Sequence, residues 1–179
     1  MALYLGRLVY YKGLDYLLDA LALVPELRLV VAGDGVLRES LHAHAERLGL
    51  QDRIYWTGAL SEADVSAVYS GADFFVLPST HRTEAFGLVQ VEAMAAGLPV
   101  VSARLGTGVE IVNEDGVSGI HVAPANASAL ADALHLLASD RACRDRLSAG
   151  ALRRAEDFTR EQLAPRYRAL YARVARCRR

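Results

Sequence analysis

The chain has 179 residues, of which 53% are hydrophobic and 23% are charged. It is long enough for one domain with a hydrophobic core, but no apolar stretch approaches the roughly 20 residues that a membrane-spanning helix needs. Two cysteines are too few for a disulfide framework, and MALYLGRL enters a strand without a secretory signal pattern, so we expect a reducing, cytoplasmic location.

Charge is unevenly distributed, although the net charge is only −1. Residues 1–140 hold 8 basic and 17 acidic residues, whereas residues 141–179 hold 12 and 4. An asymmetry of this kind can mark a contact with nucleic acid or with a membrane. Here arginine alternates with alanine, leucine and tyrosine at helical spacing, which favours a solvated helix face or one that contacts another domain. We therefore expect no nucleic-acid partner.

Strands alternate with helices along the chain. Apolar runs predict strands at residues 2–5, 27–33, 53–58, 73–77, 98–101 and 119–122. Helical spacing predicts helices at about 14–25, 36–48, 61–70, 87–96, 109–113, 126–138, 141–155 and 160–176. Either Asn126 or Ser128 is expected to cap the helix at 126–138. This pattern is typical of a doubly wound, parallel, six-stranded α/β sheet, a Rossmann-like fold, here with extra C-terminal helices. We expect residues 1–179 to form a single domain.

Ligands of such folds bind at the carboxyl ends of the strands, near the point where the strand order reverses. The loops after the first five strands carry Arg7 and Lys12, then Gly33 and Gly35, then Gly58, then Glu84, and then Gly106 to Gly108. All of these loops are expected to open on one rim of the sheet.

Arg7 and Lys12 stand in the segment GRLVYYKG, before the first predicted helix. Nineteen of the twenty basic residues are arginine, and Lys12 is the only lysine, which invites a functional interpretation. An arginine fork and a lysine point charge together suit a diphosphate. The alternative is that both are solvated surface cations.

Phe86, Gly87 and Leu88 begin the helix that follows Glu84. A helix N-terminus binds anions through its free N–H groups, so a phosphate is plausible there; the alternative is helix initiation alone. The Gly106 to Gly108 loop presents the same two alternatives.

Glu84 and Glu92 have seven residues between them. Glu92 falls in an otherwise apolar helix, where burial of an unpaired carboxylate is unfavourable. We expect it to accept hydrogen bonds from ligand hydroxyls in a shielded site. The alternatives are a buried ion pair for Glu92 and a simple loop charge for Glu84. No histidines have metal-ligand spacing, and we expect no metal.

The segment EAFGLVQVE, followed by EAMAAGLPVV, resembles retaining GT-B glycosyltransferases of the group 1, or family 4, type. GRLVYYKG, VVAGDGVLRESL, IYWTGAL and GVEIVNEDGVSGIHVAP fall in the order of that family, so the resemblance covers nearly the whole chain. It implies that Arg7 and Lys12 hold the diphosphate of a nucleotide-sugar donor. It also implies that Glu84 contacts the donor sugar and Glu92 the ribose, and that the region from Trp56 through Gly58 to Leu60 lies against the base.

The resemblance further implies a hexosyltransferase of polysaccharide biosynthesis, which uses a nucleoside-diphosphate sugar, a glycan or lipid-linked acceptor and no metal cofactor. Such enzymes have a second, N-terminal domain that holds most of the acceptor site. Only the C-terminal, donor-binding domain matches here, so we expect half an enzyme, inactive alone. Its arginine-rich C-terminal helix would contact the missing domain or a membrane surface. A GT-B sugar-nucleotide epimerase and a non-catalytic nucleotide-sugar module remain alternatives. The sequence identifies neither the base nor the sugar of the donor.

Overall fold

The computed structural model describes residues 1–176 and contains one six-stranded sheet. Its strands are β1 (Ala2–Leu5), β2 (Leu29–Ala32), β3 (Ile54–Gly58), β4 (Phe74–Leu77), β5 (Val100–Ala103) and β6 (Gly119–Val122). Every pair of neighbours is parallel, and the order across the sheet is β3-β2-β1-β4-β5-β6. The strand order therefore reverses between β1 and β4, and the predicted doubly wound sheet is confirmed.

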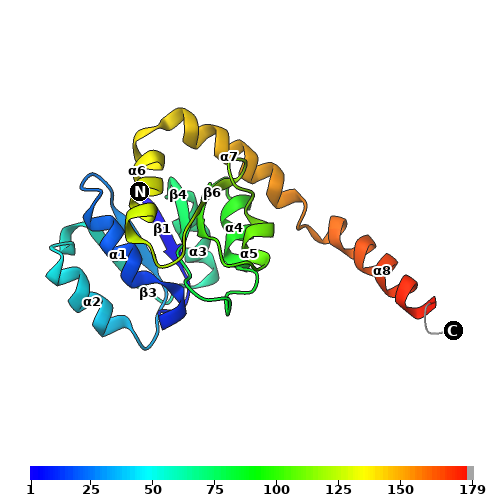
Figure 1. Cartoon of the computed structure of the whole chain (residues 1–179), viewed down its shortest axis with the longest axis horizontal. Helices are drawn as coiled ribbons and strands as arrows, with labels where there is room; N and C mark the ends of the chain where they lie inside the picture. Colours follow the sequence, from blue (N-terminus) through cyan, green and yellow to red (C-terminus); the bar gives the residue numbers. More distant parts are fainter. Residues whose placement is uncertain (177–179) are drawn as a thin grey trace.

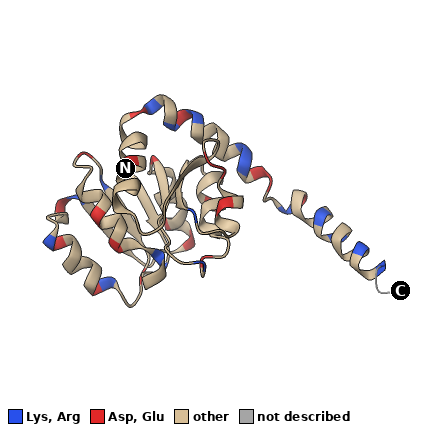
Figure 2. Ribbon diagram, in the orientation of Figure 1, with Lys and Arg blue, Asp and Glu red and all other residues tan. Residues whose placement is uncertain are grey.

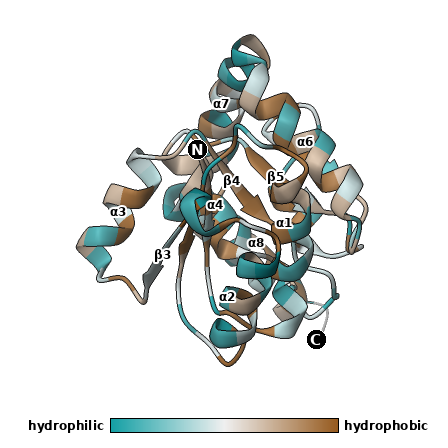
Figure 3. Cartoon of the chain, turned by 90° about the vertical axis from the view of Figure 1, so that its left-hand side faces the viewer, coloured by the Kyte–Doolittle hydropathy of each residue, from teal (hydrophilic) through white to brown (hydrophobic). Residues whose placement is uncertain are grey.

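Helices cover both faces of this sheet (Figure 1). They are α1 (Leu14–Ala22), α2 (Arg38–Arg47), α3 (Glu62–Ser70), α4 (Leu88–Ala95), α5 (Gly108–Val112), α6 (Ala127–Ser139), α7 (Arg141–Glu156) and α8 (Arg160–Arg176), with 3-10 turns η1 (Tyr10–Lys12) and η2 (Gln51–Arg53). One core joins the sheet to α1, α2 and α6, and the other joins it to α3, α4, α5 and α7. Because successive strand residues face opposite sides, Tyr4 enters the first core and Leu3 the second. β4 and β5 are accordingly hydrophobic and central in Figure 3, whereas β3 lies at the edge of the sheet.

The helix boundaries differ from the predicted ones by a few residues. The first helix ends at Ala22 rather than near Pro25, and the second begins at Arg38 rather than directly after Gly35. Asn126, not Ser128, caps α6, because its side chain accepts a hydrogen bond from the Ala129 N–H at 2.9 Å.

Two glycines let the loops at the carboxyl ends of the strands touch. At Gly33, which has φ of 130°, a Cβ atom would lie 1.9 Å from the Gly6 carbonyl oxygen. At Gly13, which has φ of 70°, it would lie 2.1 Å from the Pro78 carbonyl oxygen. Only a residue without a side chain fits either place. The loop after β1 is therefore in direct contact with the loops after β2 and β4.

The C-terminal helix α8 projects away from the rest of the molecule (Figure 1), and none of its residues is buried. Basic residues recur along it (Figure 2). It also carries an exposed apolar stripe, formed by Tyr167, Leu170 and Val174, which are 57%, 44% and 49% exposed. Within residues 1–176, no helix is both long and apolar enough to cross a membrane. Cys143 lies half-buried in α7, within the helix predicted at 141–155, whereas Cys177 lies outside the described residues.

Candidate functional site

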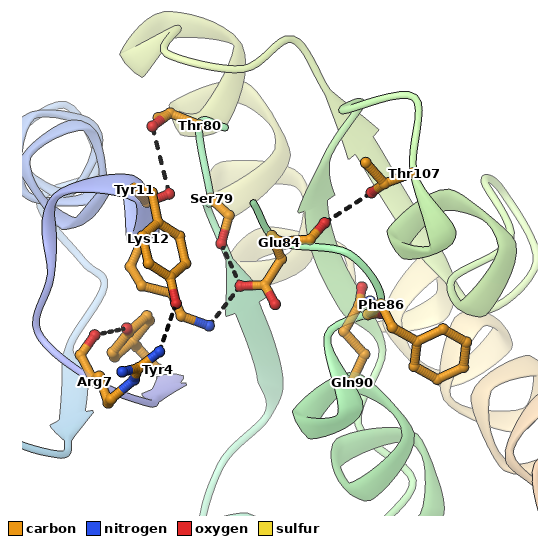
Figure 4. Close-up of polar contacts among 10 residues, drawn as sticks. All are labelled: Tyr4, Arg7, Tyr11, Lys12, Ser79, Thr80, Glu84, Phe86, Gln90 and Thr107. Carbon is orange, nitrogen blue, oxygen red and sulfur yellow. Dashed lines mark hydrogen bonds and ion pairs between the residues drawn. The ribbon is translucent and has the colours of Figure 1, made fainter. Parts of the chain in front are cut away.

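Lys12 and Glu84 form a buried ion pair where the strand order reverses (Figure 4). Lys12 ends the η1 turn after β1, and Glu84 lies between β4 and α4; Nζ is 2.5 Å from Oε2, and the side chains are only 10% and 11% exposed. The fully buried Ser79 donates its hydroxyl to the same carboxylate oxygen at 3.0 Å. Oε2 thus has two donors, while no hydrogen bond joins Oε1 to any residue in the described part of the chain.

Arg7 lies beside this pair on an exposed loop, and hydrogen bonds to two tyrosines fix its position (Figure 4). Its guanidinium donates to the Tyr11 hydroxyl at 2.9 Å, and its carbonyl accepts a hydrogen bond from the buried Tyr4 hydroxyl at 2.9 Å. Burial, and then the negative charge of Glu84, raise the pKa of Tyr4 well above its usual range. The Tyr4 hydroxyl therefore keeps its proton and acts as the donor that fixes the Arg7 loop.

The segment from Glu84 to Gly87 is tied to the start of α5. The Thr107 hydroxyl donates to the Glu84 carbonyl at 2.9 Å, and the Gly108 N–H donates to the Ala85 carbonyl at 2.8 Å. Gly87 then turns the chain into α4 with φ of 69°. Of the residues predicted at this helix start, Leu88 is exposed, and Phe86 is partly exposed and packs edge-on against Phe158.

The Gly106 to Gly108 loop does not offer a free set of N–H groups. Gly106 donates to the Glu110 carboxylate at 2.5 Å, Gly108 donates to Ala85, and Val109 donates to the Thr107 hydroxyl at 3.4 Å. Because the chain already occupies these donors, the geometry favours the second alternative for this loop, helix initiation alone.

A hollow adjoins the ion pair at the ends of β1, β2 and β3. It is lined by Leu5, Gly6, Arg7, Ala32, Gly33, Asp34, Ala59, Leu60 and Val65. Gly58 ends β3 immediately before this lining, as predicted, but Trp56 does not line the hollow. Trp56 packs on the α1/α2 side of the sheet and stacks on His42 with ring centroids 4.2 Å apart. Side chains along a strand alternate between the two faces of the sheet. Trp56 lies on one face, and Ala32, Leu60 and Val65, which line the hollow, lie on the other.

The expectation that Glu92 lies in a shielded position is wrong. Glu92 is exposed on α4 and accepts a hydrogen bond from the Tyr69 hydroxyl of α3 at 3.0 Å. Burial, and then the charge of Glu92, raise the pKa of Tyr69. Glu84, for which a solvated loop charge was the alternative, is the buried carboxylate of the two.

Four polar residues that hold the loops of this site were not predicted, namely Tyr4, Ser79, Thr107 and Gln90. One signal was available for Gln90: it is a polar residue in an apolar helix, the feature that singled out Glu92. In the described part of the chain, no three or more His, Cys, Asp or Glu residues gather closely enough to hold a metal ion.

The family model for glycosyl transferases group 1 matches residues 1–154. The chain belongs to this family. It is 34% identical over 170 residues to O-antigen chain mannosyltransferase C of Escherichia coli, and this alignment covers 94% of the chain and 45% of that relative. It is 36% identical over 187 residues to the D-inositol 3-phosphate glycosyltransferase of Streptomyces bingchenggensis, and this alignment covers 97% of the chain and 40% of the relative. This chain thus spans less than half the length of these two relatives.

Solved structures that resemble this chain have the same fold. Anabaena HepE in complex with UDP and glucose superposes with a TM-score of 0.81 at 30% identity, over 87% of this chain and 43% of its own. The C-terminal domain of a group 1 family protein from Francisella tularensis gives 0.79 at 24% identity, over 88% of this chain and 84% of its own. The latter likeness concerns the fold alone. The predicted Rossmann-like half of a GT-B architecture is confirmed for this group 1 chain.

Proposed function

We propose that this chain is the donor-binding half of a retaining glycosyltransferase, which moves a hexose from a nucleoside-diphosphate sugar to a hydroxyl of a glycan or lipid-linked acceptor. The observation that carries the proposal is the meeting of Arg7, Lys12 and Glu84 at the carboxyl ends of β1 and β4. Ligands of doubly wound sheets bind at such a reversal of strand order. The binding of UDP by HepE supports a nucleotide donor.

Lys12 and Arg7 suit the diphosphate. An ammonium has three donors, and Lys12 uses one for Glu84, which leaves two for phosphate oxygens. The exposed Arg7 guanidinium adds a second positive group next to it. Positive charge placed where the diphosphate leaves stabilises the transition state without a metal ion. Backbone N–H groups of Phe86, Gly87 and Leu88 add to this anion site.

Glu84 suits the sugar. Its Oε2 is held by Lys12 and Ser79, so the carboxylate cannot rotate freely, and Oε1 is left to accept a hydrogen bond from a sugar hydroxyl. This arrangement favours a role in positioning the reacting sugar. Glu92, held by Tyr69, would accept from the ribose, and the hollow next to Gly58 would take the base.

The acceptor half lies outside this chain in the proposal, since relatives are more than twice as long. We therefore propose that the chain alone binds the donor but transfers no sugar. In the whole enzyme, which we place in the cytoplasm, α8 would contact the second domain or the surface of a membrane.

Calorimetry with UDP, GDP, ADP, TDP and their sugars tests the proposal. At least one nucleotide should bind the wild type, and Lys12→Ala should weaken that binding about tenfold or more, because a charge-assisted hydrogen bond contributes roughly 1.5–3 kcal/mol. Arg47→Ala, which removes an exposed cation from α2, is the matched control. Absence of binding across the whole panel would overturn the proposal. Conversion of a donor sugar without an acceptor would instead indicate an epimerase.

A further inference from the structure

Gln90 is fully buried in the first turn of α4. Its side-chain amide donates a hydrogen bond at the start of the helix, where the corresponding residue of a capping box accepts one. In a capping box, the side-chain oxygen of the residue three places after the cap accepts from the cap's own N–H. Here the cap is Gly87, but Gln90 Nε2 donates to the Phe86 carbonyl at 3.1 Å and lies 3.5 Å from the Val109 carbonyl. Because both partners are carbonyls, the amide must present its nitrogen to them. Its Oε1 is buried without a partner.

This inverted bond leaves the N–H of Gly87 unused. The Phe86 carbonyl and the Gly87 N–H belong to one trans peptide, in which the two groups point in opposite directions. The two preceding carbonyls, of Glu84 and Ala85, are also fixed by partners at the start of α5. The N–H groups of Ala85, Phe86 and Gly87 consequently face away from α5, and none of the three donates to any residue among those the structure describes. Lys12 and Ser79 lie across Glu84 from Thr107 (Figure 4).

Gly87 and Gln90 fit one another closely. A Cβ atom at Gly87 would lie 2.8 Å from Gln90 Nε2 and 2.7 Å from Leu77 Cδ2, in a backbone conformation with φ of 69°. A buried acceptor without a partner lowers stability, so Gln90 Oε1 is unfavourable for folding. An apolar side chain of similar size would remove this acceptor, and it would also remove the donor to the Phe86 carbonyl. The unfavourable Oε1 is explained if the amide contributes to binding instead of to folding.

We propose that Gln90 is a positioning residue that turns the Gly87 N–H toward an anionic oxygen of the donor diphosphate. Gln90 does not touch the donor; it holds the Phe86 carbonyl, and the rigid peptide transmits that orientation to Gly87. The inference rests on the proposed function, because it needs a phosphate group on the side of the loop where Lys12 lies.

Gln90→Met is the variant that tests it. Methionine is unbranched, similar in length and adaptable in a core, so it should keep the packing, lose the bond to Phe86 and remove the unpaired acceptor. The melting temperature without ligand should change little, because the variant removes one unpaired acceptor, Oε1, and leaves another, the Phe86 carbonyl. Affinity for the nucleoside diphosphate that binds the wild type most tightly among UDP, GDP, ADP and TDP should fall about tenfold, the equivalent of one charge-assisted hydrogen bond. Val91→Met, one residue further along α4, is the matched control.

A second measurement follows the peptide itself. In ¹H–¹⁵N spectra, the Gly87 amide should shift when the nucleotide, or inorganic pyrophosphate as a simpler probe, is added to the wild type and to Val91→Met. It should shift far less in Gln90→Met. Equal affinity and an equal Gly87 shift in Gln90→Met would overturn the role of Gln90 while leaving the proposed function intact. Absence of binding by the wild type to every probe would overturn both. A fall in melting temperature with unchanged affinity would mean that Gln90 only supports the fold.

Discussion

Lys12 and Glu84 lie 72 residues apart in the chain, yet their Nζ and Oε2 atoms are 2.5 Å apart in a buried ion pair. β1 pairs with β4, and Gly13 lets the loop after β1 approach the Pro78 carbonyl, which brings the two residues together. A buried pair of this kind contributes little net stability, but removal of one partner leaves a buried charge without compensation. If the proposed function holds, the same two side chains couple stability to donor binding.

The first prediction is that Lys12→Met lowers the free energy of unfolding by about 3–5 kcal/mol, the typical effect of breaking a buried ion pair. The double variant Lys12→Met, Glu84→Gln should recover much of that loss, because no charge then remains buried. Urea denaturation of the wild type, both single variants and the double variant gives the coupling energy. Additive losses would show that the two side chains do not interact in solution.

The second prediction separates the two glutamates by ligand. Glu84→Gln should weaken the nucleotide-sugar and leave the bare nucleoside diphosphate almost unaffected, since the amide still accepts from Lys12 and Ser79. Glu92→Gln should weaken both ligands, because the ribose is common to them. In a full-length enzyme, Glu84→Gln should lower turnover more than nucleotide affinity. Calorimetry with both ligands decides it, and equal losses of bare diphosphate in the two variants would contradict this division of roles.

The sequence predicted the features that depend on residues close together along the chain. Apolar runs located all six strands, and the positions of Arg7, Lys12 and Glu84 after predicted parallel strands placed them on one rim. The burial of the two glutamates was not predictable in this way. Glu84 is buried because a distant loop closes over it through Gly13. Glu92 is exposed because α4 packs Ala93 and Met94 against the core instead. Both outcomes follow from packing between segments far apart in the sequence.

Trp56 and Gln90 illustrate two further limits. A motif placed Trp56 in a ligand-facing region, but the alternation of β3 directs its ring to His42. Gln90 stands inside the same segment as both glutamates, but its role rests on which carbonyls it meets, and these belong to Phe86 and Val109. A residue's neighbours in space, rather than its type, decide such cases.

The third prediction concerns alkaline pH. Burial raises the pKa of both Tyr4 and Tyr69, so they stay protonated in the folded protein at a pH at which unfolded tyrosines ionise, about 10. The unfolded state then binds fewer protons, and stability falls as pH rises above this value, by about 1.4 kcal/mol per pH unit for each tyrosine. Tyr4→Phe should remove about half of this slope.

Unfolding in urea at several pH values between about 9 and 11.5 measures that slope. Tyr10→Phe, which changes an exposed tyrosine near the same site, is the control and should leave the slope unchanged. An identical slope in the wild type and in Tyr4→Phe would mean that Tyr4 ionises in the folded protein, and that it does not act only as a donor to the Arg7 carbonyl.

The fourth prediction concerns α8. Since none of its residues is buried, a chain that ends at Thr159 should keep its melting temperature within about 2 °C, the shift expected for well under 1 kcal/mol at this size. The truncation retains Phe158, whose ring packs against Phe86 at 5.9 Å and so supports the site loop. In the whole enzyme the same truncation should abolish transfer, because it removes the exposed stripe of Tyr167, Leu170 and Val174 through which α8 would contact the second domain or a membrane. Leu152→Ser, on the exposed side of α7, controls for the loss of an apolar surface residue. A large fall in melting temperature of the short chain would show that α8 packs on this domain, and full activity of the truncated enzyme would show that the stripe needs no partner.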